Sequence, residues 1–228
     1  PRRPLDIVAY FAAARWIFQV WYYNKNNLGS LDKEAYLSGS VNTIKNEDGR
    51  LKGYTTDGKG YFDSLKNAGF DAANKRIVIL GAGGAAKSII VKGALSGVEE
   101  ISVFKRNNDT FKDTLKFIEN IKEETGTEIN LIPFEDKTAL KTTIQKADLL
   151  CNATNVGMGE DKSCPVNPEY LHKELFVSDI IYHPKETTLL LKAKEKGART
   201  LNGEDMLFFQ GVASFKIWTG QEMPLTLD

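Results

Sequence analysis

Short aliphatic runs alternate with longer amphipathic segments along most of the chain. Between the runs, apolar residues recur at three- and four-residue spacing, as Phe111, Leu115 and Ile118 do. Strands that alternate with helices are typical of βαβ units, whose consecutive strands are parallel. We predict a doubly wound parallel sheet over about 59–202, with polar helical segments between its later strands. The predicted strands lie at about 76–80, 100–104, 129–134, 147–154, 175–182 and 199–201.

Two apolar segments lie outside this alternation. The final one is predicted to be a helix up to Trp218 that packs against whatever residues 1–57 form. The early one, 7–23, is 17 residues long and contains Arg15 and Gln19, so it falls short of a membrane span. It also lacks a secretory cleavage pattern. We interpret it as buried or misassigned sequence.

A glycine-rich turn follows the first predicted strand. The stretch 76–90 is RIVILGAGGAAKSII, and a helical pattern begins at about Ala85. Such a turn aims backbone N–H groups and the positive end of a helix dipole at one point, which suits a phosphate. The small side chains let a pyrophosphate and the helix approach closely. We predict cofactor contacts at Ala82, Gly83, Gly84 and Ala85; the alternative is a turn that binds nothing.

The segment after the second predicted strand carries both signs of charge. In dinucleotide folds this position reaches the adenosine ribose, where a carboxylate favours a free 2′-hydroxyl and a cation favours a 2′-phosphate. Lys105 and Arg106 therefore favour NADP, whereas Asp109 comes late and is also placed to cap the next helix. We predict cofactor contacts at Lys105, Arg106, Asn107 and Asn108 and acceptance of NAD or NADP; a solvated turn is the alternative.

Composition narrows the class of partner. The chain has 228 residues, of which 42% are hydrophobic, so it can bury a substantial core. Its 30 basic residues balance 30 acidic ones, which favours a small-molecule partner over nucleic acid or a membrane. Cys151 and Cys164 cannot form a disulfide framework, and with His172 and His183 they lack the spacing of a zinc site. We predict no metal and a cytoplasmic location.

A series of short motifs carries a family resemblance. In order they are SVNTI, GYTTDG, GAGGAAK, NATNVGM, DIIYHPKETTLL, NGEDMLFFQG and FKIWTG, from about residue 37 to the end. This ordered set is similar to the shikimate dehydrogenase family. The stretch FKRNNDTF looks closest to the quinate/shikimate dehydrogenase branch, in which either nicotinamide cofactor is used.

The resemblance implies a reaction and a domain plan. The reaction is reversible hydride transfer between a nicotinamide ring and a ring carbon of shikimate or quinate, with 3-dehydroshikimate or 3-dehydroquinate as the ketone. Residues 58–202 would form a Rossmann-like dinucleotide-binding domain. Residues 1–57 would form a smaller, incomplete α/β substrate-binding domain, to which residues 203–228 return. A homodimer is compatible with this plan.

The resemblance also implies substrate contacts. Asn42 and Gln210 match amides that bind substrate hydroxyls, although Asn42 also suits a turn and Gln210 a buried structural amide. Asp57 matches the aspartate that contacts substrate and pairs with a catalytic lysine; without the resemblance a helix cap would be the simpler interpretation. Thr56 stands where the family usually has asparagine. We predict a substrate site of Asn42, Asp57, Tyr182 and Gln210, with Asp57 catalytic.

The nicotinamide end of the cofactor is predicted from the later motifs. Asn155 follows a strand at the carboxyl edge of the sheet, where ligands bind in open α/β folds. Ile180 and Tyr182 match positions that flank the nicotinamide, with Tyr182 also near substrate. Gly203 matches a glycine whose backbone approaches the same ring. The alternatives are a core isoleucine, a packed tyrosine and a helix-start glycine.

One family feature is missing from its expected place. The proton-transfer lysine of the family should fall near residues 17–22, where the sequence has none; Lys25 is the nearest candidate. We expect either an atypical or truncated N-terminus or a divergent protein that has lost catalysis. Three interpretations therefore stay open: a shikimate or quinate dehydrogenase, a catalytically impaired nucleotide-binding relative, and a folate-linked dehydrogenase, against which GYTTDG and MLFFQG argue.

Overall fold

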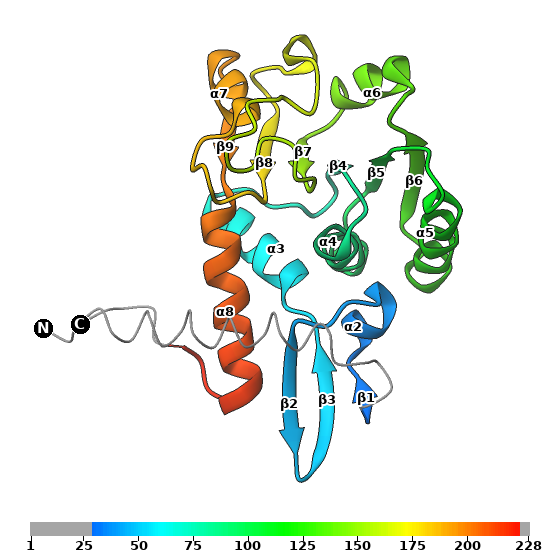
Figure 1. The fold of residues 1–228 in the computed structure, drawn as a ribbon, viewed down its shortest axis with the longest axis vertical. Helices are drawn as coiled ribbons and strands as arrows, with labels where there is room; N and C mark the ends of the chain where they lie inside the picture. The colour runs from blue at the N-terminus through cyan, green and yellow to red at the C-terminus, as the bar shows by residue number, and fades with distance from the viewer. Residues whose placement is uncertain (1–28, 224–228) are drawn as a thin grey trace, which may run out of the picture.

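The computed structural model describes residues 29–223. The larger of its two sheets has six parallel strands (Figure 1). The strand order is β6-β5-β4-β7-β8-β9. The order reverses between β4 and β7, and open α/β sheets bind ligands outside the carboxyl ends of the strands at such a point. The predicted fold class is confirmed. The strands are β4 (Arg76–Leu80), β5 (Glu100–Lys105), β6 (Glu128–Pro133), β7 (Leu149–Asn152), β8 (Phe176–Asp179) and β9 (Arg199–Leu201).

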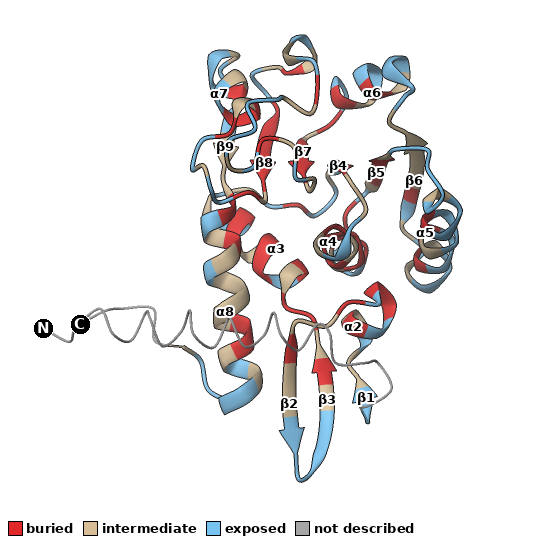
Figure 2. Ribbon diagram, viewed as in Figure 1, coloured by how far each residue is buried: buried red, intermediate tan, exposed pale blue. Residues whose placement is uncertain are grey.

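Helices cover both faces of this sheet. They are α4 (Gly84–Leu95), α5 (Phe111–Thr125), α6 (Lys137–Ile144) and α7 (Thr188–Glu195). Aliphatic residues of α4 and α5 form one core with alternate strand residues such as Ile77 and Ile79. The other strand face, with Val78 and Leu80, packs with α6 and α7 in a second core. Figure 2 shows the buried residues gathered on the strands and the inward helix faces.

One connection differs from the sequence prediction. A helix was expected in each connection between the later strands, but β7 and β8 are joined by a loop with one short 3-10 turn, η2 (Pro168–Tyr170). Gly157 and Gly159 both adopt positive φ in this loop, a conformation that ends regular structure. In addition, β8 ends at Asp179, so the last residues of the predicted strand 175–182 lie in a loop.

A smaller sheet precedes the parallel one. It has the order β1-β3-β2, in which β1 runs parallel and β2 antiparallel to β3. The remaining helices are α2, α3 and the long α8, which lies alongside α3 (Figure 1). The elements of this part are β1 (Ser30–Leu31), α2 (Lys33–Ser38), β2 (Thr43–Glu47), β3 (Arg50–Tyr54), α3 (Asp57–Asn67) and α8 (Gly203–Thr219).

Close contacts join α8 to the first part of the chain. A Cβ added at Gly60 of α3 would lie 2.5 Å from the backbone nitrogen of Gln210, so only glycine allows this approach. Near the C-terminal end of α8, the Trp218 indole donates a hydrogen bond to the Ile44 carbonyl at 3.0 Å. None of the helices within residues 29–223 is both long and apolar enough to cross a membrane. The apolar stretch 7–23 lies outside the described residues.

Candidate active site

Three of the predicted substrate residues meet where α3, α8 and β2 come together. The Asn42 side-chain amide donates to Asp57 Oδ1 at 2.6 Å and to Gln210 Oε1 at 3.3 Å. Asn42 directly precedes β2, Asp57 is the first residue of α3, and Gln210 lies within α8. We call these three residues the amide–carboxylate cluster. The packing of α8 on α3 thus joins side chains 168 positions apart in sequence.

The Thr56 backbone and two hydroxyls that were not predicted as part of the site, those of Thr43 and Ser214, hold this cluster in place. Asn42 Oδ1 accepts from the Thr56 backbone at 2.9 Å and from the Thr43 hydroxyl at 3.1 Å. The Ser214 hydroxyl lies 2.8 Å from that of Thr43. Because Ser214 follows Gln210 by four residues on one helix face, this spacing was the signal available in the sequence. The amide of Asn42 is therefore fixed from both ends.

Asp57 lies in a partly buried environment that favours its neutral form. Desolvation raises its pKa above the ordinary value, and the hydrogen bond from Asn42 opposes this rise. Among the residues that the structure describes, no lysine or arginine forms an ion pair with Asp57; Lys25 lies outside them. A raised pKa makes the ionised carboxylate a stronger proton acceptor, which is the property required of a general base.

The glycine turn directly follows β4, where the strand order reverses. Gly81 has φ +101°, and a Cβ on it would lie 2.8 Å from the Ala153 carbonyl oxygen in the loop after β7. A Cβ on Gly83 would meet nothing within 4 Å, so open space lies over this residue. Gly83 caps α4 without a side-chain hydrogen bond, and the first N–H groups of that helix remain available to an anion. Ala82 lies in the same turn, and Gly84 and Ala85 are the first two residues of α4.

Charged groups surround the end of β5, the predicted adenosine end. The Lys105 ammonium donates to Asn108 Oδ1 at 2.5 Å and to the Thr110 hydroxyl at 2.8 Å. Desolvation and the neighbouring Arg106 lower the pKa of Lys105. Asn107 donates its backbone N–H to Glu135 at 3.2 Å. Glu135 follows the adjacent strand β6, so its place beside Asn107 depends on the β5–β6 pairing and carried no local sequence signal.

The predicted nicotinamide contacts lie on loops at the carboxyl edge of the sheet. Gly203 opens α8, and a Cβ on it would lie 2.1 Å from the Ile180 carbonyl oxygen, so the two backbones touch. Tyr182 is 55% exposed, and Asn155 is also exposed. The structure therefore brings Ile180 and Gly203 together and leaves Asn155 and Tyr182 accessible to a ligand.

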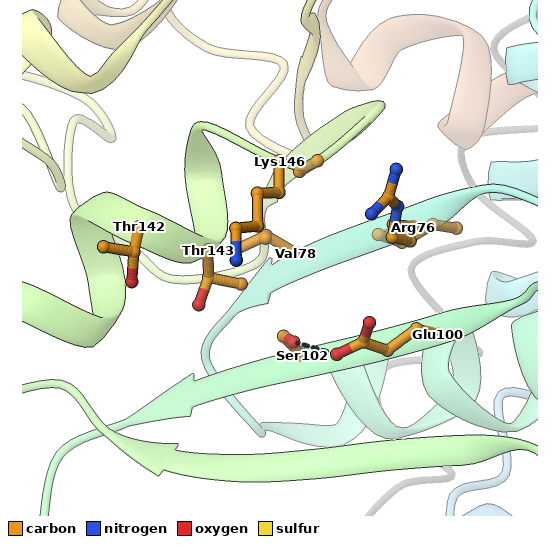
Figure 3. A pocket seen from close by; sticks show the side chains of 9 residues that line it. Arg76, Val78, Glu100, Ser102, Thr142, Thr143 and Lys146 are labelled. Carbon is orange, nitrogen blue, oxygen red and sulfur yellow. Dashed lines mark hydrogen bonds between the residues drawn. The ribbon is translucent and has the colours of Figure 1, made fainter.

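A separate hollow lies at the opposite, amino edge of the sheet (Figure 3). Its volume is about 270 Å³, and its labelled side chains come from β4, β5 and the region of α6. It is distant along the strands from the glycine turn and was not predicted from the sequence. It is lined by Arg76, Ile77, Val78, Glu100, Ser102, Thr142, Thr143, Lys146 and Ala147. Within residues 29–223 no group of three or more histidine, cysteine or acidic residues could hold a metal ion.

Comparison with known proteins bears on the family of this chain. The family model for the shikimate 5'-dehydrogenase C-terminal domain matches residues 203–227. A shikimate dehydrogenase (NADP(+)) of Listeria monocytogenes is 43% identical over 208 residues, which is 89% of this chain and 72% of the relative. A shikimate dehydrogenase (NADP(+)) of Streptococcus pneumoniae is 45% identical over 199 residues, covering 86% and 68% of the two chains.

A solved structure extends the likeness to three dimensions. Shikimate 5-dehydrogenase from Listeria monocytogenes, crystallised with shikimate and NAD, superposes with a TM-score of 0.84 at 40% identity. The match covers 98% of this chain and 80% of the other. Identity of this extent over most of both chains, together with the shared fold, establishes descent. This chain belongs to the shikimate dehydrogenase family.

Proposed function

We propose that this chain is an NAD(P)-dependent oxidoreductase that interconverts a ring hydroxyl of shikimate, or of quinate, and the corresponding ketone. The amide–carboxylate cluster is the observation that carries this proposal. A polyhydroxylated ring needs donors and acceptors fixed in space to hold one pose. Asn42 and Gln210 supply amides that both donate and accept, and Asp57 supplies a titratable group beside them.

In this proposal the cluster orients the substrate and moves one proton. The reacting carbon loses a hydride and its hydroxyl loses a proton, so oxidation needs an acceptor for each. Asp57 is the titratable member of the cluster, and its raised pKa makes its carboxylate a better base. Asn42 holds Asp57 by the 2.6 Å hydrogen bond and so sets the direction of its free oxygen.

The glycine turn and the carboxyl-edge loops fit a nicotinamide dinucleotide. When bound, the dinucleotide supplies the hydride acceptor or donor. The open space over Gly83 and the α4 N-terminus suit its pyrophosphate. We propose that Lys105, Arg106, Asn107 and Asn108 contact the adenosine end, and that the nicotinamide end contacts Asn155, Ile180, Tyr182 and Gly203.

Steady-state assays test this function directly. Purified chain is mixed with NAD or NADP and with shikimate or quinate, and reduction of the dinucleotide is followed by absorbance. We expect saturable turnover that Asp57→Ala lowers by roughly 10²- to 10⁴-fold, the usual contribution of general acid–base assistance. Substrate oxidation that Asp57→Ala leaves unchanged would contradict the role of Asp57, and Lys25→Ala would then be tested first.

A second candidate is a nucleotide-binding relative with weak or no dehydrogenase activity. It is favoured by the environment of Asp57, which has no cationic partner within residues 29–223. Calorimetric titration separates the two candidates, because the relative binds a dinucleotide yet reduces none with either substrate. Absence of dinucleotide binding would contradict both.

The composition of the chain supports a cellular location and a type of binding partner. The described cysteines, Cys151 and Cys164, are free thiols, and charge is balanced over the chain. We propose a cytoplasmic enzyme whose partners are small molecules rather than nucleic acid or membrane. A homodimer is compatible with this proposal, and light scattering on the eluted protein would detect it.

A further inference from the structure

Asp179 is a buried carboxylate at the carboxyl edge of the sheet for which the reaction has no direct use. It is the last residue of β8 and is 1% exposed. Its register partner is Asn152, the last residue of β7, which is fully buried. The two side chains therefore lie side by side where the two flanking loops begin.

Asn152 ties Asp179 to the loop after β7. Its side-chain nitrogen donates to Asp179 Oδ2 and to the Val156 carbonyl, each at 3.1 Å. Its side-chain oxygen accepts from the Thr154 backbone at 3.1 Å and from the Thr154 hydroxyl at 2.7 Å. Both ends of this amide are engaged. The segment 152–156, which carries Asn155, is thus folded around one side chain that Asp179 orients.

The same carboxylate holds the loop after β8. Asp179 Oδ1 accepts the Ile181 backbone N–H at 3.0 Å, and Ile181 in turn accepts from the Gly203 N–H at 3.0 Å. Asp179 Oδ2 also accepts the Thr187 hydroxyl at 2.8 Å. Thr187 is 1% exposed and caps α7. The path of Ile180 and Tyr182 past the sheet edge therefore depends on Asp179.

Burial of the Asp179 carboxylate costs free energy, and its hydrogen bonds offset part of this cost while holding the surrounding segments in place. A buried carboxylate without a cation loses solvation, and no lysine or arginine of the described residues pairs with Asp179. Burial raises its pKa, opposed by the donors Asn152, Ile181 and Thr187. Each donor belongs to a different segment, so one group fixes three segments relative to one another.

We propose that Asp179 is the positioning residue for the nicotinamide half of the dinucleotide site, because it holds the loops of Asn155 and Tyr182 in one mutual arrangement. This inference rests on the proposed function. Loss of Asp179 should therefore affect the nicotinamide end of the cofactor site and not the adenosine end. The adenosine end, at the glycine turn and Arg106, has no hydrogen bond to Asp179 among the described residues, so we expect it to depend less on this residue.

Asp179→Asn tests this separation. Both carboxylate oxygens of Asp179 accept hydrogen bonds, so the new amide nitrogen must face a donor in either orientation, the Asn152 nitrogen or the Ile181 N–H. Asn152 cannot turn over to relieve this without losing both bonds from Thr154. Binding of NAD and NADP is compared with that of ADP-ribose and 2′-phospho-ADP-ribose, which lack the nicotinamide. We expect dinucleotide affinity to fall about tenfold, as for one lost charge-assisted hydrogen bond, while the ligands without nicotinamide keep their affinity. Equal loss for both ligand classes, or loss for neither, would overturn the proposal.

Two further sets of variants distinguish a local effect on the nicotinamide loops from a general destabilisation of the fold. Asp148→Asn is the matched control, because Asp148 accepts the Arg76 N–H at 2.9 Å at the amino edge of the same sheet; it should leave both ligand classes unchanged. Thr187→Val removes one donor to Asp179, whereas Thr187→Ser keeps it. We expect the valine variant to repeat the selective loss and the serine variant to bind normally; matching behaviour of the two would count against the proposal. Wild-type protein that binds no dinucleotide would overturn the proposed function itself.

Discussion

Lys105 and Arg106 are adjacent cations, but their charges are not equally available. The Lys105 ammonium is engaged by Asn108 and Thr110, whereas Arg106 is exposed and its guanidinium has no partner among the described residues. Arg106→Ala should therefore weaken NADP more than NAD by about 1.5–3 kcal/mol, the value of a charge-assisted hydrogen bond. Lys105→Ala is the matched variant and should change the NADP/NAD ratio less. Calorimetric titration measures both, and equal loss of NAD and NADP in Arg106→Ala would refute the assignment.

Asp57 links stability to pH in the direction opposite to most carboxylates. Its pKa is raised in the folded chain, so the folded state binds the proton more tightly, and stability falls as pH rises through the folded pKa. Asp57→Asn removes this cost and keeps an acceptor for Asn42. We expect the variant to be more stable than wild type at pH 7 and the difference to vanish as pH approaches the ordinary value of 3.8. Urea unfolding at the two pH values measures this.

Asp161 is a control for Asp57, because its pKa is shifted in the opposite direction. Hydrogen bonds from Ser163 and the Gly157 N–H lower its pKa to about 2, so the ionised form is favoured by folding. Asp161→Asn should therefore destabilise the protein at pH 7, and the loss should disappear as pH falls toward 2. For Asp57 the contrary outcome is a wild-type protein that is more stable than Asp57→Asn at pH 7. That outcome would indicate a cation paired with the Asp57 carboxylate.

At the scale of elements, the turn between β4 and α4 makes the sharpest prediction. Gly83 has an ordinary φ of −75° and no neighbour within 4 Å of a Cβ, so Gly83→Val should fold. Its branched side chain would fill the space that a pyrophosphate needs, and dinucleotide affinity should fall by at least about 100-fold, or 2.7 kcal/mol. Gly29→Val is the control, since a Cβ there makes only ordinary contacts. Unchanged titrations of a folded Gly83→Val protein would exclude this turn as the binding site.

For the whole molecule, ligand binding should appear as added thermal stability. A dinucleotide at about 100 times its Kd stabilises the folded state by about 2.7 kcal/mol, which raises Tm by roughly 5–10 °C in a chain of this size. Differential scanning fluorimetry measures the shift, and Gly83→Val should abolish it. Shikimate should add a smaller shift that Asn42→Ala removes. A shift from the dinucleotide that persists in Gly83→Val would place its binding elsewhere.

The six parallel strands, the glycine turn and the grouping of Asn42, Asp57 and Gln210 could be predicted from the sequence alone. Periodicity and turn chemistry are local properties, and the family motifs name residues whatever their distance along the chain. The helix expected between β7 and β8 was a wrong prediction, although Gly157, Gly159, Pro165 and Pro168 in this segment are local signals for a loop.

Packing in three dimensions sets which groups touch and how far their pKa values shift. The approach of α8 to α3 at Gly60 placed Gln210 beside Asn42, and pairing of β7 with β8 placed Asp179 beside Asn152. The pKa of a carboxyl depends on its burial and on donors from other elements, so the state of Asp57 could not be deduced from its neighbours in sequence. Contacts between distant segments are set by packing, and no local pattern encodes them.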